Sequence, residues 1–260
     1  MSLPPERRRE TRVPSSMPVR LGSGSQVLDV QAVDVSLSGV RLRVPLGALG
    51  LGPEAALGEA ARVLRQRLGD AFAASLSYVT LGPLVRRVLR VAHLARVEQP
   101  VPAVVLGCEM RSPLGEAEVL ALGLVLAELS APPPPPADEH EAQRLMARAV
   151  LAGEAGPGRE ALQVTIHEAR RARIVVALAG AQRLGALADG GDACALASAV
   201  DQRVGPRPTL TVLAGSQAAW SGPVRLEGLQ WFRPQDMLHL DLLPDPPMDA
   251  AGRHALGLDS

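Results

Sequence analysis

The sequence predicts a mainly β protein with minor α content, divided into two domains. Three observations support this prediction. Many short segments alternate apolar and polar residues, which is the pattern of strands with one buried face. Few segments repeat apolar residues at helical spacing. Residues 132–136 are five consecutive prolines, and such a run forms an extended spacer between folded parts.

The composition allows a sizeable core but gives the chain no overall field. The 260 residues are 47% hydrophobic and only 2% aromatic, so Leu, Val and Ala must fill the core. The formal net charge is zero, and a neutral chain is not drawn as a whole to nucleic acid or to an anionic membrane. We therefore expect no nucleic-acid partner, and we expect any recognition of a charged ligand to be local.

The cysteines and the amino-terminal residues suggest where the protein acts. Cys108 and Cys194 are the only cysteines, and two distant cysteines make neither a disulfide framework nor a metal cluster. No apolar run is long enough to span a bilayer, and the polar, basic amino terminus does not resemble a signal peptide. We expect a cytoplasmic protein without a membrane span.

Six segments of the first half have strand-like sequence. In the clearest of them, Val40, Leu42 and Val44 alternate with Arg41 and Arg43, so the apolar side chains would face a core and the arginines would face solvent. Short turns between neighbouring segments indicate antiparallel pairing. The six segments are residues 19–21, 27–35, 40–44, 72–78, 89–97 and 104–110.

Two helices are expected in the first domain, which we assign to residues 1–130. The apolar residues switch to helical spacing over about residues 53–69, where a proline stands in the first turn. This segment reads as a helix inserted between two strands. A second helix follows the last strand, with Ser112 as its predicted N-cap.

The second half repeats this style after a linker at residues 131–137. We predict a second mostly-β domain over residues 138–260, with a degenerate copy of the first barrel as one option. Its tail beyond Pro244 is polar and rich in proline, which predicts fraying. The predicted strands are residues 162–166, 173–178, 209–213, 224–231 and 237–243, and the predicted helices are residues 139–151 and 193–200.

Two motifs precede the strand at residues 40–44. Arg8 and Arg12 have the spacing R-x-x-x-R, and Asp34, Ser36 and Gly39 have the spacing D-x-S-x-x-G. Taken singly, a basic arm is usually solvated, and Asp-x-Ser before a strand is often a turn that hydrogen-bonds its own backbone. It is their combination, in this order and in this strand context, that is informative.

The combination resembles the PilZ domain, a family of bacterial receptors for cyclic di-GMP. The likeness covers roughly residues 6–130 and includes the strand hairpin at residues 88–110 and the helix after it. It implies a six-stranded antiparallel β-barrel with a C-terminal helix, and together with the helix read from the sequence it predicts a PilZ-like barrel with inserted and C-terminal helices. The inserted helix departs from the family pattern, and the barrel stays closed only if residues 72–78 supply the next strand.

The resemblance also implies which residues bind cyclic di-GMP. In the family the matched positions of both motifs contact the ligand, and we add the two arginines beside them on the same arm. The predicted ligand-binding residues are Arg7, Arg8, Arg9, Arg12, Asp34, Ser36 and Gly39.

These residue types suit a ligand with two phosphates and two guanines. Arginine can bind the O6/N7 edge of guanine bidentately or pair with a phosphate. Asp34 can accept hydrogen bonds from guanine N–H groups. Ser36 can donate to a phosphate or hold the turn, and Gly39 permits positive φ or a close backbone approach.

The function implied by the resemblance is that of a receptor. Ligand binding would order the arginine arm, rearrange the domains and so reach an unidentified protein partner. The alternative is a nucleotide-independent adaptor or scaffold for protein–protein interaction. The oligomeric state stays open.

No enzyme is expected. The five histidines are scattered, and none has metal-ligand spacing with another ligating residue. The sequence contains no nucleophile-elbow pattern. We therefore predict no catalytic residue, no metal site and no cofactor. A second basic cluster, Arg170, Arg171 and Arg173, reads as a solvated strand entrance, with an interdomain groove as the alternative.

Overall fold

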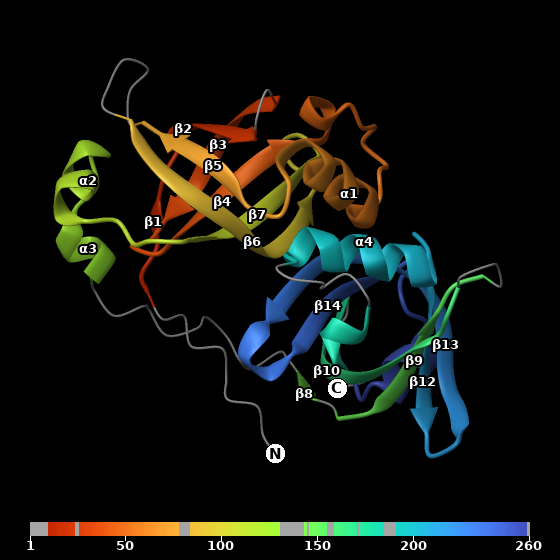
Figure 1. Ribbon diagram of the computed structural model, residues 1–260. Helices are drawn as coiled ribbons and strands as arrows, with labels where there is room; N and C mark the ends of the chain where they lie inside the picture. Colours follow the sequence, from red (N-terminus) through yellow and green to blue (C-terminus); the bar gives the residue numbers. More distant parts are fainter. Residues whose placement is uncertain are drawn as a thin grey trace.

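The computed structural model shows a mainly β protein built from two barrels, with short helices around them (Figure 1). The residues that the structure describes are 10–23, 26–77, 84–130, 143–144, 146–154, 159–170, 172–184 and 191–258. The predicted linker at residues 131–137 lies outside them, so the assignment of residues 1–130 and 138–260 to two domains stays a prediction.

Six antiparallel strands close the first barrel. Each strand pairs with the next around the ring, and the last pairs again with the first. The order is β2 (Pro18–Ser23), β3 (Gln26–Val35), β4 (Gly39–Pro45), β7 (Ala103–Met110), β6 (Val85–Val97) and β5 (Phe72–Leu76). The predicted barrel is therefore confirmed, and β5 supplies the strand on which its closure depends.

The alternation in the sequence accounts for the inside of this barrel. Val40, Leu42 and Val44 on β4 are fully buried, whereas Arg41 and Arg43 remain partly exposed. Leucine and valine fill most of the interior, as the low aromatic content requires.

The inserted helix of the first half lies where it was expected, whereas the single helix expected after the last strand is divided into two short ones. The inserted helix α1 (Leu57–Leu68) follows the 3-10 turn η1 (Leu46–Leu49), and α2 (Glu116–Ala121) and α3 (Leu126–Ser130) follow the last strand. The predicted N-cap of α2 is wrong. Gly115 takes this position, and its backbone N–H donates to Glu118 Oε2 at 2.8 Å, so the acidic first turn of the helix satisfies the free backbone group.

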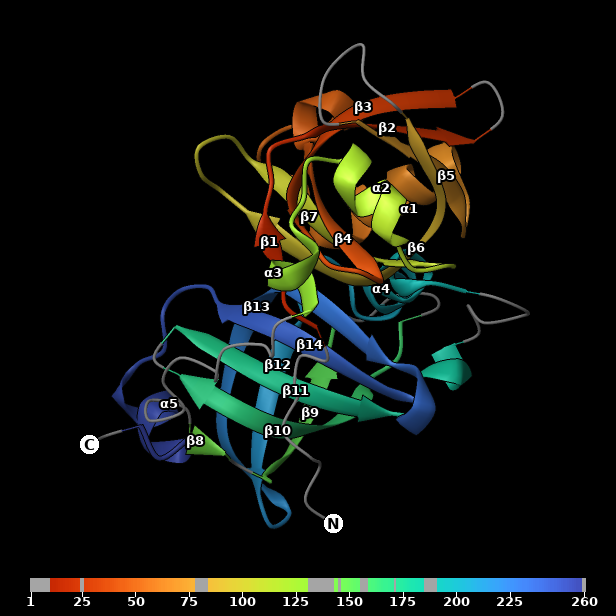
Figure 2. The ribbon, with the colours of Figure 1, turned by 90° about the vertical axis from the view of Figure 1, so that its left-hand side faces the viewer.

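The second half forms a second closed six-stranded barrel (Figure 2). All its strand pairs are antiparallel, and its last strand also returns to its first. The order around the ring is β9 (Arg148–Ala152), β10 (Leu162–Arg170), β11 (Arg173–Ala179), β14 (Met237–Pro244), β13 (Gln217–Phe232) and β12 (Thr209–Ala214).

Element by element, the two barrels correspond. In both, the strands follow each other around the ring in the chain order first, second, third, sixth, fifth, fourth. A 3-10 turn and a 12-residue helix stand between the third and fourth strands, namely η3 (Ala181–Leu184) and α4 (Ala193–Val204) in the second half. A two-residue strand, β1 (Val13–Pro14) or β8 (Gln143–Arg144), pairs with the second strand of each barrel.

Two predictions for the second half are wrong. Residues 139–151 were expected to be helical, but their described part carries β8 and β9. Ala149 and Leu151 are buried on alternate positions of β9, so pairing with β10 and β12 overrides the helix propensity of this Ala- and Arg-rich stretch.

The tail is not frayed either. It forms α5 (Ala250–Ala255), which Asp249 caps by accepting a 2.7 Å hydrogen bond from the Gly252 backbone N–H. Met248 and Leu256, on either side of the helix, are buried. A capped start and two apolar anchors hold a segment that composition alone marks as polar.

The two barrels join through equivalent elements. Strands β6 and β13, the fifth of each barrel, pair over three residues centred on Leu94 and Leu229. Helices α1 and α4 pack against each other, and a Cβ on Gly58 would lie 2.3 Å from the Cβ of Asp201. Each half thus presents the same strand and the same helix to the other, as the partners of a two-fold symmetric interface do.

Candidate functional site

The turn between β3 and β4 carries the D-x-S-x-x-G motif. The Ser36 backbone N–H donates to the Gly39 carbonyl oxygen at 2.8 Å, and the Ser36 hydroxyl donates to the same oxygen at 3.3 Å. Because Ser36 is buried, its hydroxyl holds the turn rather than facing solvent. This contact serves the second of the two roles considered for Ser36, and a contact with the ligand stays a prediction.

Gly39 is required by a close approach between strands. A Cβ at this position would lie 2.8 Å from the backbone oxygen of Cys108 on β7, which is closer than side-chain carbons come to a backbone oxygen. The glycine therefore lets β4 and β7 approach each other directly behind the turn.

Strand β1 brings the arginine arm to this turn. Its pairing with β3 sets Val13 opposite Val35, so that Arg12 Nη1 lies 2.8 Å from Asp34 Oδ1. Residues 22 positions apart in the sequence thus meet in a partly buried ion pair. Arg7, Arg8 and Arg9 lie outside the described residues.

A second arginine, which the sequence analysis left out of the site, completes the surroundings of Asp34. Arg41 Nε lies 3.1 Å from Asp34 Oδ2, because the register sets Arg41 directly opposite Asp34. The sequence shows Arg41 only as an outward-facing residue on the strand after the turn. Its place opposite Asp34 depends on the strand register, which a β-bulge between Ala32 and Asp34 shifts by one residue.

Glu10 and Ser38 were also missed. One oxygen of the Glu10 carboxylate, Oε2, accepts two hydrogen bonds from Ser38, one from the backbone N–H at 2.9 Å and one from the hydroxyl at 2.8 Å. Glu10 stands inside the R-x-x-x-R spacing and Ser38 inside the D-x-S-x-x-G spacing. The two motifs therefore contact each other through residues that neither pattern specifies.

A row of paired residues leads from this site to the joint between the barrels. Arg41 pairs with Gly107, Gly107 with His93, and His93 with Gln230 of the second half. A Cβ on Gly107 would lie 3.0 Å from the His93 Cβ, so the His93 side chain lies across the glycine. With neighbouring strands about 4.8 Å apart, Arg41 is only about 10 Å from the strand that joins the halves.

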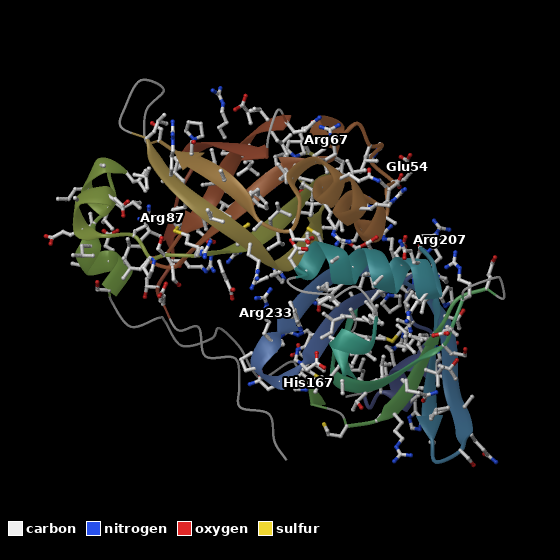
Figure 3. The ribbon with its side chains drawn as sticks, in the orientation of Figure 1. Glu54, Arg67, Arg87, His167, Arg207 and Arg233 are labelled. Atoms are coloured by element: carbon white, nitrogen blue, oxygen red, sulfur yellow. The ribbon has the colours of Figure 1, made fainter. Side chains whose placement is uncertain are left out.

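On the other side of the joint, the turn η4 (Arg233–Gln235) follows β13. The guanidinium of Arg233 lies 4.4 Å from the ring centre of Trp231, and its Nη2 donates to the Gly191 carbonyl oxygen at 3.0 Å. Figure 3 shows Arg233 on the side of the second barrel that faces the first. This residue links the end of β13 to the segment that starts α4.

Of the second basic cluster, Arg173 lines a pocket between the halves, as the alternative considered for the cluster requires. This pocket of about 180 Å³ is bounded by Arg96 and Ala95 of the first half and by Arg173, Glu227 and Asp241 of the second. Arg173 Nε donates to Asp241 Oδ1 at 3.0 Å. The charge of Arg173 is thus paired within the chain, although its side chain remains exposed.

The chain offers little else for chemistry among the described residues. Burial raises the pKa of the Cys108 thiol, which lies inside the first barrel, far above its usual range, so it is not a reactive thiolate. Within the part of the chain that the structure describes, no group of three or more His, Cys, Asp or Glu side chains is arranged to hold a metal ion. No helix among these residues is long and apolar enough to cross a membrane.

Comparison with known proteins identifies the family that the two motifs resemble. Residues 6–119 match the family model of the PilZ domain. No curated protein matches the sequence. Among solved structures, the chain is similar to the PlzA protein of Borreliella burgdorferi in complex with c-di-GMP, with 9% identity, coverage of 95% of this chain and 92% of that one, and a TM-score of 0.31.

Two further structures show a similar degree of likeness. The Bacillus subtilis inhibitor of motility (MotI/DgrA) has 9% identity, coverage of 94% and 95%, and a TM-score of 0.29. YcgR from Escherichia coli in complex with c-di-GMP has 9% identity, coverage of 94% and 80%, and a TM-score of 0.27. TM-scores of this size support no conclusion about function, whereas the family match includes every residue of the candidate site.

Proposed function

Residues 6–119 of this chain are a PilZ domain, and on that premise we propose that the protein is a receptor for cyclic di-GMP. Its proposed ligand-binding residues are those of the two motifs, with Arg41 added from the geometry. We propose further that the protein has no catalytic activity of its own and acts in the cytoplasm.

The observation that carries the proposal is the contact between Arg12 and Asp34 beside the turn. It supports the proposal because the two motifs, predicted to act together, meet at 2.8 Å on the rim of one barrel. Asp34 also lies 3.1 Å from Arg41, so two guanidinium groups converge on one carboxylate. Guanidinium groups held in this way are suited to phosphate oxygens and guanine edges.

In the proposed complex, the ligand takes over contacts that the protein now makes with itself. Guanine N–H groups replace Arg12 on the Asp34 carboxylate, and the released guanidinium pairs with the ligand. Arg7, Arg8 and Arg9 precede Arg12 on the same arm and add further charge as the arm orders around the ligand.

We propose that binding reaches a protein partner through a rearrangement at the joint of the barrels. The row from Arg41 through Gly107 to His93 ends on β6, which pairs with β13 over only three residues. A shift of β6 would move Gln230 and, through Arg233 and Gly191, the start of α4. The partner itself is not identified by these contacts.

We also propose that the second barrel is a degenerate PilZ-like copy. The shared strand order, the helix between the third and fourth strands and the short strand before the second one support this. The second half has arginines at the R-x-x-x-R spacing, such as Arg144 and Arg148, but no D-x-S-x-x-G motif to combine with them, so its role in the proposal is to receive the signal rather than to bind the ligand.

Calorimetric titration with cyclic di-GMP tests the proposal. Wild type should bind at micromolar concentration or below, and Arg12→Ala, Arg8→Ala and Asp34→Ala should each weaken binding by at least about tenfold, as loss of a charge-assisted contact does. Arg20→Ala is the matched control, because Arg20 forms an exposed 2.9 Å pair with Asp29 on the same barrel. Absence of binding, or equal losses in the control, would defeat the proposal.

One observation favours the alternative of a nucleotide-independent adaptor. Both oxygens of Asp34 and both donors of Ser38 already have partners within the chain, so the site is satisfied without a nucleotide. Capture of the same partner proteins by wild type and Asp34→Ala, with and without cyclic di-GMP, would support the adaptor.

A further inference from the structure

The contact between Glu10 and Ser38 has the form of an occupied anion site. Two donors of one residue, the Ser38 backbone N–H and its hydroxyl, converge on a single carboxylate oxygen at 2.9 and 2.8 Å. Ser38 sits on the outside of the motif turn, next to Gly39 and two residues from the buried Ser36. The turn therefore aims a backbone and a side-chain donor at the same point outside the barrel.

The geometry points to this pair of donors as an oxyanion site for one phosphate of the nucleotide, for which the Glu10 carboxylate stands in. This inference rests on the proposed function, and it adds Ser38 as a phosphate contact and Glu10 as the internal competitor. A carboxylate oxygen and a phosphate oxygen both carry negative charge and accept hydrogen bonds of the same length from N–H and O–H groups. One can therefore replace the other without any change in the turn.

The turn is built to keep both donors in place when Glu10 leaves. The Ser38 carbonyl oxygen accepts a 2.8 Å hydrogen bond from the Met110 backbone N–H, and the carbonyl of the neighbouring Leu37 accepts one from Leu114 at 2.8 Å. Strand β7 and the segment after it thus fix the turn from the other side. Nothing in this anchoring depends on Glu10.

Glu10, in contrast, is placed to move. It lies at the start of the described arm, two residues before Arg12, and is partly exposed. Glu10 and Arg12 hold the arm to the turn at two points, Ser38 and Asp34. In the arm, Glu10 is the acceptor for the Ser38 donors, and Arg12 is the donor to the Asp34 carboxylate. A phosphate oxygen and a guanine N–H of the ligand would make the same two contacts.

Competition follows from charge. A phosphate and the Glu10 carboxylate repel each other and need the same two donors, so the ligand binds only after Glu10 has been displaced. The contact lowers the affinity of the resting protein and sets the ligand concentration at which the arm is released.

The test is calorimetric titration of cyclic di-GMP into the full chain and four variants, each checked for an unchanged melting temperature. Glu10→Ala and Glu10→Gln should tighten binding, the first by about tenfold, because a competing charge-assisted hydrogen bond is lost. Ser38→Ala should weaken binding by about five- to tenfold, since one of two donors is removed. In Glu10→Ala/Ser38→Ala the gain from removing Glu10 should shrink, because both residues act on one site.

Glu109→Gln is the matched control. Glu109 is exposed on β7 directly opposite Gly39, so its loss removes the same charge near the turn without freeing Ser38. Its affinity should stay within about twofold of wild type, as expected for an exposed, screened charge.

The outcomes separate this inference from the proposed function. Binding by wild type that is unchanged or weaker in Glu10→Ala would overturn the inference and leave the receptor function standing, and so would equal gains in Glu10→Ala and Glu109→Gln. Binding by neither wild type nor any variant would overturn the proposed function itself. Tighter binding confined to the two Glu10 variants would support both.

Discussion

The two barrels share a scaffold but differ at the turn between their second and third strands. In the first barrel, a bulge precedes Asp34, and in the second, a bulge at the same place precedes Glu168. The short strand β8 sets Arg144 opposite Glu168, just as β1 sets Pro14 opposite Asp34. Glu168 is therefore the structural counterpart of Asp34.

The surroundings of these two carboxylates are different. Asp34 is buried between Arg12 of the arm and Arg41 of the opposite strand. Glu168 faces Val175 across the strands and pairs at 2.7 Å with Arg170 of its own turn. Asp34 thus pairs with a cation from a separate segment, Arg12, whereas Glu168 pairs with a cation of its own strand.

The two barrels also differ in the side chain that lies across a glycine next to the joint. In the first barrel, His93 of β6 lies across Gly107 of β7, whereas in the second, Asp241 of β14 lies across Gly228 of β13. Asp241 then pairs with Arg173. One scaffold therefore carries a first turn whose carboxylate pairs with two arginines and a second turn whose Glu168 pairs with Arg170, and the difference in chemistry lies in the side chains and not in the fold.

The largest expected effect comes from Gly39, whose counterpart in the second barrel is Arg173. We expect Gly39→Ala to lower the free energy of unfolding by about 2 kcal/mol, because β4 and β7 must move apart to admit the Cβ. Urea denaturation measures this change. Gly47→Ala is the control, since a Cβ there meets nothing within 4 Å. Equal stability of the two variants would show that the first turn needs no glycine.

A reciprocal exchange tests whether Arg41 distinguishes the two turns. Arg41→Val gives the first barrel the residue that stands at the counterpart position, Val175, and should weaken cyclic di-GMP binding by about tenfold through loss of one guanidinium contact. Val175→Arg should leave affinity unchanged, because the second barrel lacks the D-x-S-x-x-G motif. Isothermal titration measures both, and an unaffected Arg41→Val variant would remove Arg41 from the site.

The starts of the counterpart helices differ in their pH dependence. The N-cap residue of α1, Ala56, provides no side-chain hydrogen bond, whereas the N-cap residue of α4 is Asp192, whose Oδ1 accepts a 3.0 Å hydrogen bond from the Ala195 N–H. Asp192 is fully buried, and its other oxygen has no hydrogen-bond partner among the residues that the structure describes. Burial raises the pKa of this carboxyl to about 6.

A raised carboxyl pKa makes the folded protein bind a proton that the unfolded chain has already lost. Stability should therefore fall as the pH rises from about 4 to about 6 and then level off. Relative to Asp192→Asn, which keeps the cap, wild type should be about 1 kcal/mol more stable at about pH 5 than at about pH 7. Urea denaturation at both pH values checks this, and parallel pH profiles would contradict it.

The smallest effect is expected in the counterpart turn of the second barrel. Arg173→Ala removes the ion pair with Asp241, which is largely exposed on the arginine side. Such pairs contribute at most about 1 kcal/mol, so we expect a change of about 0.5 kcal/mol or less and an unaltered affinity for cyclic di-GMP. Thermal melting and titration with cyclic di-GMP measure both quantities in Arg173→Ala and, side by side, in Arg12→Ala. A loss of affinity in both variants would show that the two turns do not differ in ligand binding.

Much of the first barrel could be predicted from its sequence, because strict alternation in segments such as residues 40–44 encodes which face is buried. Residues 139–151 could not, because Ala, Arg and Leu suit a helix locally and only the pairing of β9 with two neighbours makes the strand stable. The helix at Ala250–Ala255 was missed because its anchors, Met248 and Leu256, stand outside the helical stretch.

The same limit applies to the site. Arg12 and Asp34 were paired by motif, and the geometry brings them together. Arg41 was predicted only as an outward arginine, since its place opposite Asp34 depends on a bulge that no local pattern reveals. Glu10 and Ser38 occupy variable positions of their motifs, so their contact depends on how the arm lies across the turn, which is set by the pairing of β1 with β3.

The central claim is that the turn of the first barrel, and not its counterpart, receives the nucleotide. The most direct measurement is amide NMR of the full chain during titration with cyclic di-GMP. We predict saturable chemical-shift changes at the amides of Thr11, Arg12, Ser38 and Gly39. We predict no change in the amide shifts of Glu168, Arg170 and Arg173. Shifts centred on the second turn, or none at the first, would contradict the account.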